Sequence, residues 1–155
     1  MSASRVLVVG LGNDLMGDDG VGLEVVRRLA AAGPWPGVRI VEAGSDSLVL
    51  AELWAGEEEV WLVDALLGGA PPGTVRLLEH DELLALPQRH ATAHHLSLPE
   101  NLRWLALAHP GLASVRYRLW GVEPSRVEPV SGFSAEAAAG AAVLVRRLAT
   151  ALDDG

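Results

Sequence analysis

Short apolar runs separated by polar, glycine-rich segments divide this chain into alternating strands and helices. Runs rich in β-branched residues at 6–9, 38–41 and 60–63 predict strands, and the first and third read as buried on both faces. Helical spacing of apolar residues follows in the segments 21–29 and 48–54. A strand–helix–strand–helix–strand order of this kind predicts a three-layer α/β fold with right-handed crossovers.

The connection after the third strand is different, because only a short Gly- and Pro-rich linker joins Asp64 to the strand-like residues 74–78. A parallel return needs about a dozen residues or more. We therefore expect the fourth strand to run antiparallel at a sheet edge, with a fifth strand at 115–122. The predicted fold class is a three-layer α/β/α sandwich with a five-stranded mixed sheet, like that of phosphorylase/hydrolase-like proteins. Further helices are expected near 81–86, from 97 to 108 and from 134 to 152.

Length and composition narrow the class of protein. The 155 residues, half of them hydrophobic, predict a single domain over 1–155. A net charge of −8 disfavours nucleic acid and an anionic membrane surface as partners. No apolar run approaches the roughly 18 residues of a membrane helix, and the N-terminus does not read as a signal peptide. With no cysteine for disulfides or thiolate chemistry, a cytoplasmic location is predicted.

Candidate chemistry is concentrated where parallel strands are expected to end, which is where open α/β sheets bind ligands. The glycine-rich loop 10–22 follows the first strand and carries Asp18 and Asp19. It departs from a dinucleotide fingerprint because Leu15 stands at the third glycine position, and the two carboxylates would oppose a pyrophosphate. The same carboxylates suit a metal cation, or alternatively they cap the following helix.

Asp64 and a group of histidines extend this candidate site. Asp64 ends an apolar strand, where a buried carboxylate is costly without a partner. Its alternative role is to accept hydrogen bonds from loop amides. Three of the five histidines fall within six residues, at His90, His94 and His95. Two carboxylates and one imidazole can hold a borderline divalent ion such as nickel, zinc or iron. No H-E-x-x-H or G-x-S-x-G motif is present, which excludes a zincin and disfavours a serine hydrolase.

In this order along the chain, these segments resemble the hydrogenase maturation endopeptidases. The resemblance lies in the sequence Gly-Leu-Gly-Asn-Asp-Leu-Met-Gly-Asp-Asp-Gly-Val-Gly at 10–22, in Leu-Val-Asp-Ala at 62–65, in Thr-Ala-His-His-Leu-Ser-Leu at 92–98 and in Gly-Val-Glu-Pro at 121–124. It implies a site in which Asp19, Asp64 and His94 bind nickel and carry the reaction. The adjacent His95 can exchange roles with His94.

The same resemblance implies the reaction and the partner. Family members remove a short C-terminal peptide from the nickel-loaded precursor of the nickel–iron hydrogenase large subunit, and they are commonly monomers. Nickel is then brought by the substrate, and a weak, open site shares its coordination. Specificity for the loaded precursor follows from differential affinity. The ion can polarise the scissile carbonyl or activate water, or a carboxylate can act as general base while nickel only positions the substrate.

Two other functions are compatible with parts of the sequence. Peptidyl-tRNA hydrolases also begin with a strand and Val-Gly-Leu-Gly-Asn, but here Asn13 is followed by Asp14-Leu15, no histidine precedes His80, and the chain is acidic. A metal-binding maturation chaperone without peptidase activity would use the same three ligands. It would bind nickel tightly by itself, whereas a peptidase that senses loaded substrate would bind it weakly.

Overall fold

The computed structural model describes residues 4–86 and 98–154. In this part of the chain one five-stranded sheet has the order β2-β1-β3-β5-β4. The strands are β1 Val6–Leu11, β2 Val38–Gly44, β3 Glu59–Ala65, β4 Val75–Leu78 and β5 Arg116–Val122. Parallel pairs join β1 to β2, β1 to β3 and β3 to β5, whereas β4 is antiparallel to β5 at the edge. The predicted mixed sheet with an antiparallel fourth strand is thereby confirmed.

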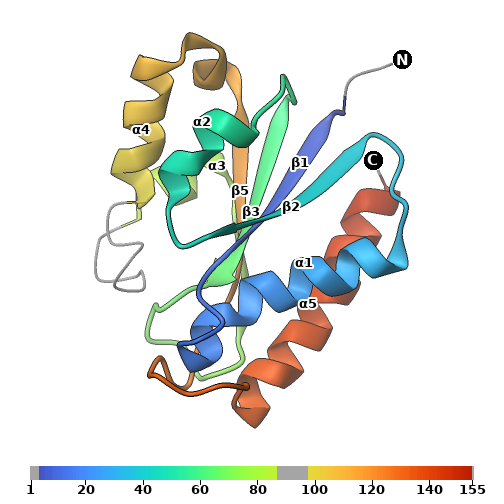
Figure 1. Cartoon of the computed structure of the whole chain (residues 1–155), viewed down its shortest axis with the longest axis vertical. Helices are drawn as coiled ribbons and strands as arrows, with labels where there is room; N and C mark the ends of the chain where they lie inside the picture. The colour runs from blue at the N-terminus through green and yellow to red at the C-terminus, as the bar shows by residue number, and fades with distance from the viewer. Residues whose placement is uncertain (1–3, 87–97, 155) are drawn as a thin grey trace.

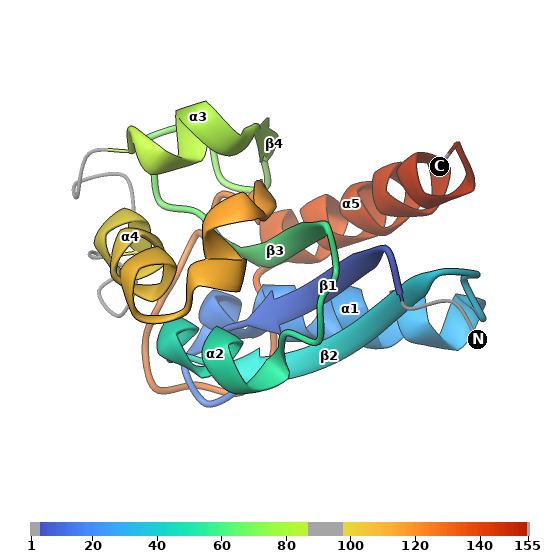
Figure 2. The same cartoon turned by 90° about the horizontal axis from the view of Figure 1, so that it is seen from above.

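Helices cover both faces of this sheet and complete the predicted three layers (Figures 1 and 2). One face carries the long helices α1 and α5, and the other carries α2, α3 and α4. Their bounds are α1 Val21–Ala32, α2 Leu50–Leu53, α3 His80–Leu84, α4 Leu98–Ala108 and α5 Ala135–Asp153. The described residues also form 3-10 segments at η1 Gly17–Gly20, η2 Ser47–Val49 and η5 Pro110–Ser114. The helix predicted at 48–54 is thus divided between η2 and α2.

Strand alternation divides the hydrophobic core into two parts. Leu7 and Val9 of β1 pack on the side of α2, α3 and α4, while Val6 and Val8 pack on the side of α1 and α5. Because helices cover both faces, every residue of β1 is buried. This is why the strand is a continuous apolar run rather than an alternating one. None of the helices in the described ranges has the length and apolar character that crossing a membrane requires.

Side chains cap the helical segments η2 and α5 but not α1. Ser134 accepts a hydrogen bond from the Ala137 amide at 3.1 Å, and Asp46 accepts one from the Leu48 amide at 3.0 Å. At α1 the N-cap is Gly20, and no side chain caps the helix. The expectation that Asp18 or Asp19 caps this helix is therefore wrong. Both aspartates lie within the 3-10 segment η1, and their carboxylates accept hydrogen bonds from Asn13 and from the loop after β5.

The first turn of α1 lies directly against the backbone of the sheet. A Cβ atom on Gly22 would stand 2.2 Å from the carbonyl oxygen of Val63, 2.6 Å from that of Leu11 and 2.8 Å from the Cα of Asp64. These residues end β1 and β3, on either side of the point where the strand order reverses. Such a switch point is where open α/β sheets bind ligands. The close approach therefore joins the start of α1 to the edge that carries the candidate chemistry.

We predict that Gly22→Ala destabilises the protein. Replacing glycine by alanine in a helix ordinarily stabilises it by about 0.5–1 kcal/mol. Here the added methyl group meets three backbone atoms, and we expect a loss of about 2 kcal/mol or more in the free energy of unfolding. Urea denaturation measures the change. Ala30→Gly, at an exposed position of the same helix, should cost no more than about 1 kcal/mol. A Gly22→Ala protein as stable as the parent would contradict the close approach.

Candidate active site

Four acidic side chains are buried at the carboxyl ends of the parallel strands. Asp18 and Asp19 lie in η1 after β1, Asp64 is near the end of β3, and Glu123 directly follows β5. Buried carboxylates are costly unless hydrogen bonds or cations compensate them. Their partners therefore separate the residues that hold the loops together from those that remain candidates for chemistry.

Asp19 is held by the fold of its own loop. Its Oδ2 accepts a hydrogen bond from the Asn13 amide at 3.1 Å. Gly12 adopts a φ of +136°, and a Cβ atom there would stand 2.1 Å from the carbonyl oxygen of Asp19. Only glycine permits both this backbone conformation and this close approach. The Gly-x-Gly-Asn part of the motif thus folds the loop back onto η1 and places Asp19 at the switch point.

Asp64 reaches the same corner of the molecule from β3, as the sequence predicts. Its Oδ1 accepts a hydrogen bond from the amide of Ala65 at 2.8 Å. Val63 and Ala65 face α1 and α5, so alternation directs Asp64 toward the opposite face, on which α4 begins at Leu98. The segments η1 and β3 are in contact, and the Gly22 backbone touches that of Asp64. The structure thus brings the elements that carry Asp19 and Asp64 together.

The third predicted ligand, His94, and its neighbour His95 lie outside the described residues, so the complete trio stays a prediction. Within residues 4–86 and 98–154, no group of three or more histidine, cysteine, aspartate and glutamate side chains is arranged to hold a metal ion. The two aspartates supply oxygen donors that suit a divalent cation. His80 has a structural role instead, because its Nδ1 accepts a hydrogen bond from the Tyr117 amide at 2.9 Å at the edge of β5.

Asp18 holds the loop after β5 against η1, whereas the sequence suggested that it caps α1. Its carboxylate accepts hydrogen bonds from the Ser125 amide at 2.8 Å and from the Arg126 amide at 3.1 Å. It also accepts from the Ser134 amide at 2.7 Å and the Ser134 hydroxyl at 2.6 Å. Burial alone would raise the pKa of Asp18. The hydrogen bonds from Ser134, Arg126 and Ser125 outweigh burial and hold the pKa below the ordinary value of 3.8.

Glu123 performs a similar task between the loops that follow β3 and β5. Its Oε1 accepts hydrogen bonds from the amides of Gly68 at 3.0 Å and Ala70 at 3.1 Å. The sequence interpretation quoted Glu123 only as part of Gly-Val-Glu-Pro and gave it no role. The signal that could have found it is the one that singled out Asp64, namely a carboxylate that directly follows an apolar strand.

This chain is similar in sequence and in fold to known proteins. A family model described as hydrogenase maturation protease matches residues 23–150. The hydrogenase 2 maturation protease of Escherichia coli is 30% identical over 132 residues, which cover 84% of this chain and 79% of that protein. The structure of the NiFe hydrogenase maturation protease HybD from Thermococcus kodakarensis is similar, with a TM-score of 0.82, 29% identity and coverage of 96% of this chain and 99% of that one. The structure of the hydrogenase maturating endopeptidase HybD of E. coli is also similar, with a TM-score of 0.82 and 26% identity. The match covers 97% of this chain and 93% of that one.

We predict that Asp18→Asn destabilises the protein by about 2–4 kcal/mol at pH 7, because an amide cannot accept all four hydrogen bonds. The pKa of Asp18 is lower in the folded than in the unfolded chain. Its stabilisation is therefore complete above the unfolded value near 3.8 and is lost as the pH falls through the lower folded value. Urea denaturation at pH 7 and pH 3 measures the free energy of unfolding of both proteins. The deficit of the variant relative to the parent should be smaller at pH 3 than at pH 7.

Asp14→Asn is the matched control for this measurement. Asp14 lies in the same loop, and its exposed carboxylate pairs with Arg27 at 2.7 Å. An exposed pair of this kind contributes about 1 kcal/mol or less, so Asp14→Asn should remain close to the parent in stability. An Asp18→Asn deficit that is equally large at pH 3 and pH 7 would show that the charge of Asp18 is not what stabilises the loop.

Proposed function

We propose, since this chain belongs to the hydrogenase maturation protease family, that it removes the C-terminal peptide of the nickel-loaded precursor of a nickel–iron hydrogenase large subunit. The observation that carries the proposal is the convergence of η1 and β3, which bear Asp19 and Asp64, at the switch point of the sheet. His94 is the proposed third member of the site. Nickel enters this site as part of the substrate.

The hydrogen bonds that hold the buried carboxylates in position support this proposal. Asp18 and Glu123 bind backbone amides of the surrounding loops. Asp19 and Asp64 each accept a backbone hydrogen bond from a residue close in sequence, Asn13 and Ala65 respectively. Such bonds fix the direction in which a carboxylate points. Two oriented carboxylates beside one imidazole can share a cation that the thiolates of the precursor already hold.

Cleavage requires that the oxygen of a water molecule adds to the scissile carbonyl carbon, that the carbon–nitrogen bond breaks, and that the departing amine gains a proton. A carboxylate at this site can accept the proton of the attacking water as general base. The nickel ion of the substrate supplies positive charge that anchors the precursor and can polarise the neighbouring carbonyl. Binding that depends on this ion delays cleavage until nickel has been inserted. Cytoplasmic location and a monomeric state stay predictions of the sequence.

Substitutions at the proposed site should block processing without unfolding the protein. We expect Asp19→Asn, Asp64→Asn and His94→Ala each to lower the rate of cleavage of the nickel-loaded precursor about a hundredfold or more. Mass spectrometry of the released peptide measures the rate, and thermal denaturation verifies the fold. Asp14→Asn and His95→Ala are the matched controls and should process normally. Normal processing by all three site variants would refute the assignment. If His95→Ala blocks processing and His94→Ala does not, His95 is the third member of the site instead of His94.

The precursor without nickel should not be cut. Because two carboxylates and one imidazole form a weak site, we also expect the isolated protein to bind nickel weakly in calorimetric titration. Reloading the same precursor with nickel should restore cleavage. Efficient cleavage of the nickel-free precursor would refute substrate sensing. Tight nickel binding without any cleavage of the loaded precursor would identify a metal chaperone instead.

A further inference from the structure

Large apolar side chains are exposed in every loop that follows a parallel strand. Seven such side chains are exposed within the described residues, and four of them belong to these loops. We call these four residues the apolar rim: Leu15 after β1, Leu48 after β2, Leu67 after β3 and Val127 after β5. Isolated exposed apolar residues are ordinary on protein surfaces. Their gathering around one edge of the sheet is characteristic of an interaction surface.

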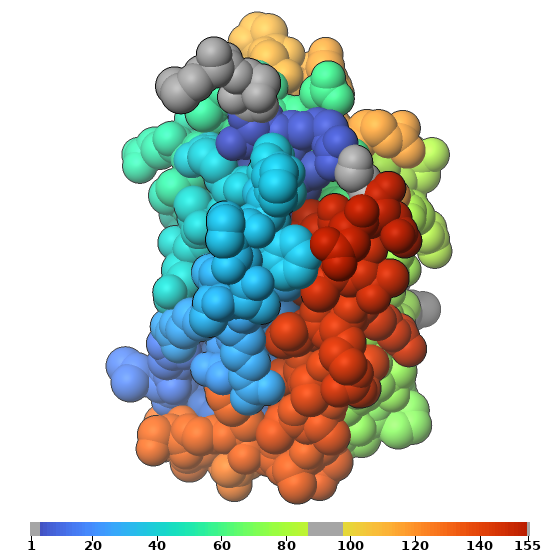
Figure 3. Space-filling view, turned by 90° about the vertical axis from the view of Figure 1, so that its right-hand side faces the viewer, coloured from blue at the N-terminus to red at the C-terminus, as the bar shows by residue number. Residues whose placement is uncertain are grey.

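Hydrogen bonds join the loops of the apolar rim into one continuous edge. The Gly12 amide donates to the carbonyl of Gly44 at 2.9 Å, which links the loops after β1 and β2. The Gly17 amide donates to the carbonyl of Val130 at 2.9 Å, which links those after β1 and β5. Glu123 links the loops after β5 and β3. In Figure 3 the orange loop after β5 forms the bottom of the molecule, with a blue segment projecting beside it on the left.

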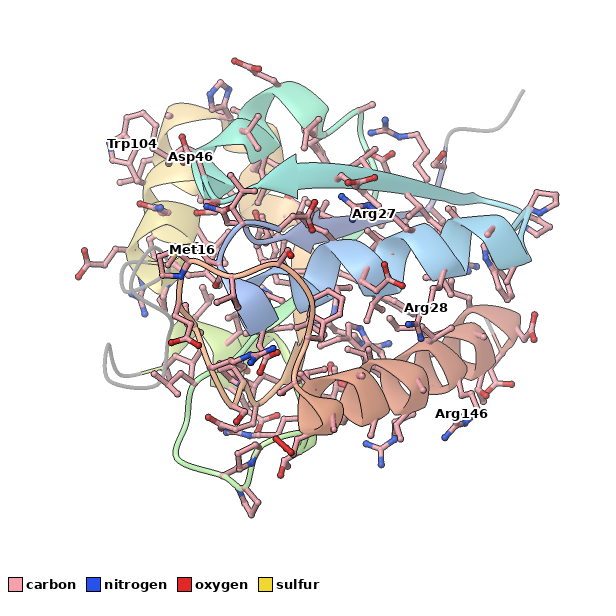
Figure 4. All side chains as sticks on the ribbon, turned by 60° about the horizontal axis from the view of Figure 1, so that its bottom comes forward. Met16, Arg27, Arg28, Asp46, Trp104 and Arg146 are labelled. Atoms are coloured by element: carbon pink, nitrogen blue, oxygen red, sulfur yellow. The ribbon has the colours of Figure 1, made fainter. Side chains whose placement is uncertain are left out.

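Figure 4 turns this end of the molecule toward the viewer and shows Met16 beside the loop that follows β5. The floor and surroundings of the apolar rim are strongly acidic. Apart from Asp14, which is paired with Arg27, the segments 12–20, 45–49, 66–74 and 123–134 together contain five acidic residues and a single arginine, namely Asp18, Asp19, Asp46, Glu123, Glu128 and Arg126. An apolar edge around buried carboxylates is complementary to a segment in which apolar side chains flank a metal ion that can accept carboxylate oxygens as ligands.

We propose that the apolar rim is the docking surface for the hydrogenase large-subunit precursor. It takes a segment of the precursor in which apolar residues lie on either side of the nickel-bearing centre. This inference rests on the proposed function and extends it, because it assigns affinity for the precursor to side chains that perform no chemistry. The nickel centre meets Asp19 and Asp64, and the apolar rim holds the polypeptide around it. Substitutions in the rim should therefore change KM and leave kcat nearly unchanged.

The test is steady-state cleavage of the nickel-loaded precursor by rim variants. Truncating a central apolar contact in an interface typically costs about a tenfold loss of affinity. We expect Leu15→Ser and Leu67→Ser each to raise KM about three- to tenfold, the double variant to raise it more, and kcat to change less than about twofold. Leu15→Met combined with Leu67→Met keeps the apolar surface and should retain the parental KM. Thermal denaturation verifies that the variants are folded.

Leu107→Ser is the matched control. Leu107 is 84% exposed and Leu15 is 74% exposed, so the two substitutions remove similar amounts of accessible apolar surface. Leu107 stands near the far end of α4, which runs away from the rim toward the amino ends of the strands (Figure 1). Its KM should equal that of the parent. An unchanged KM in the folded rim double variant, or a fall in kcat alone, would refute the proposed docking surface. The proposed peptidase function would not be affected by that result. Failure of the parent protein to cut the precursor would instead refute the proposed function.

Discussion

The candidate site depends on the contact between the first turn of α1 and the backbone at the ends of β1 and β3. Without a side chain at Gly22, the helix can approach the Val63 carbonyl and the Asp64 backbone closely enough to touch them. Gly12 allows the preceding loop to fold back onto Asp19 in the same way. The close backbone contacts at Gly22 and Gly12 leave no room for a Cβ atom. They therefore determine the position of η1 relative to β3, and with it the position of Asp19 relative to Asp64.

A second constraint is the amount of negative charge that this corner must hold. Asp18 accepts hydrogen bonds from backbone amides and the Ser134 hydroxyl, and Glu123 accepts hydrogen bonds from backbone amides. Through these bonds the two carboxylates hold three loops in place. Asp19 and Asp64 add two further buried carboxylates. Carboxylate oxygens suit a cation, and under the proposed function the substrate supplies one as its own metal ion. Under the proposed function, the loops that Asp18 and Glu123 stabilise therefore surround the two carboxylates that meet the metal-loaded precursor.

The proposed surroundings of the site follow the same division between polar floor and apolar edge. Parallel strands end together, so each strand contributes one loop to the same rim. In this protein every such loop exposes a large apolar side chain, while the carboxylates lie beneath. Family membership gives the reaction, and the arrangement of these loops gives a physical account of how a folded precursor can be held while its terminal segment is cut.

The sequence by itself determined the order and type of the main strands and helices, the antiparallel fourth strand and the positions of Asp19 and Asp64. Periodicity, linker length and the glycine motif are local properties of the chain, and they are sufficient for these conclusions. Only the tertiary structure decided what each carboxylate does. Asp18 and Asp19 are adjacent and chemically identical, but successive side chains in a 3-10 segment point in different directions. Asp18 therefore binds a loop more than a hundred residues away in sequence, while Asp19 binds its own. Partners so distant are set by packing, which no local pattern records.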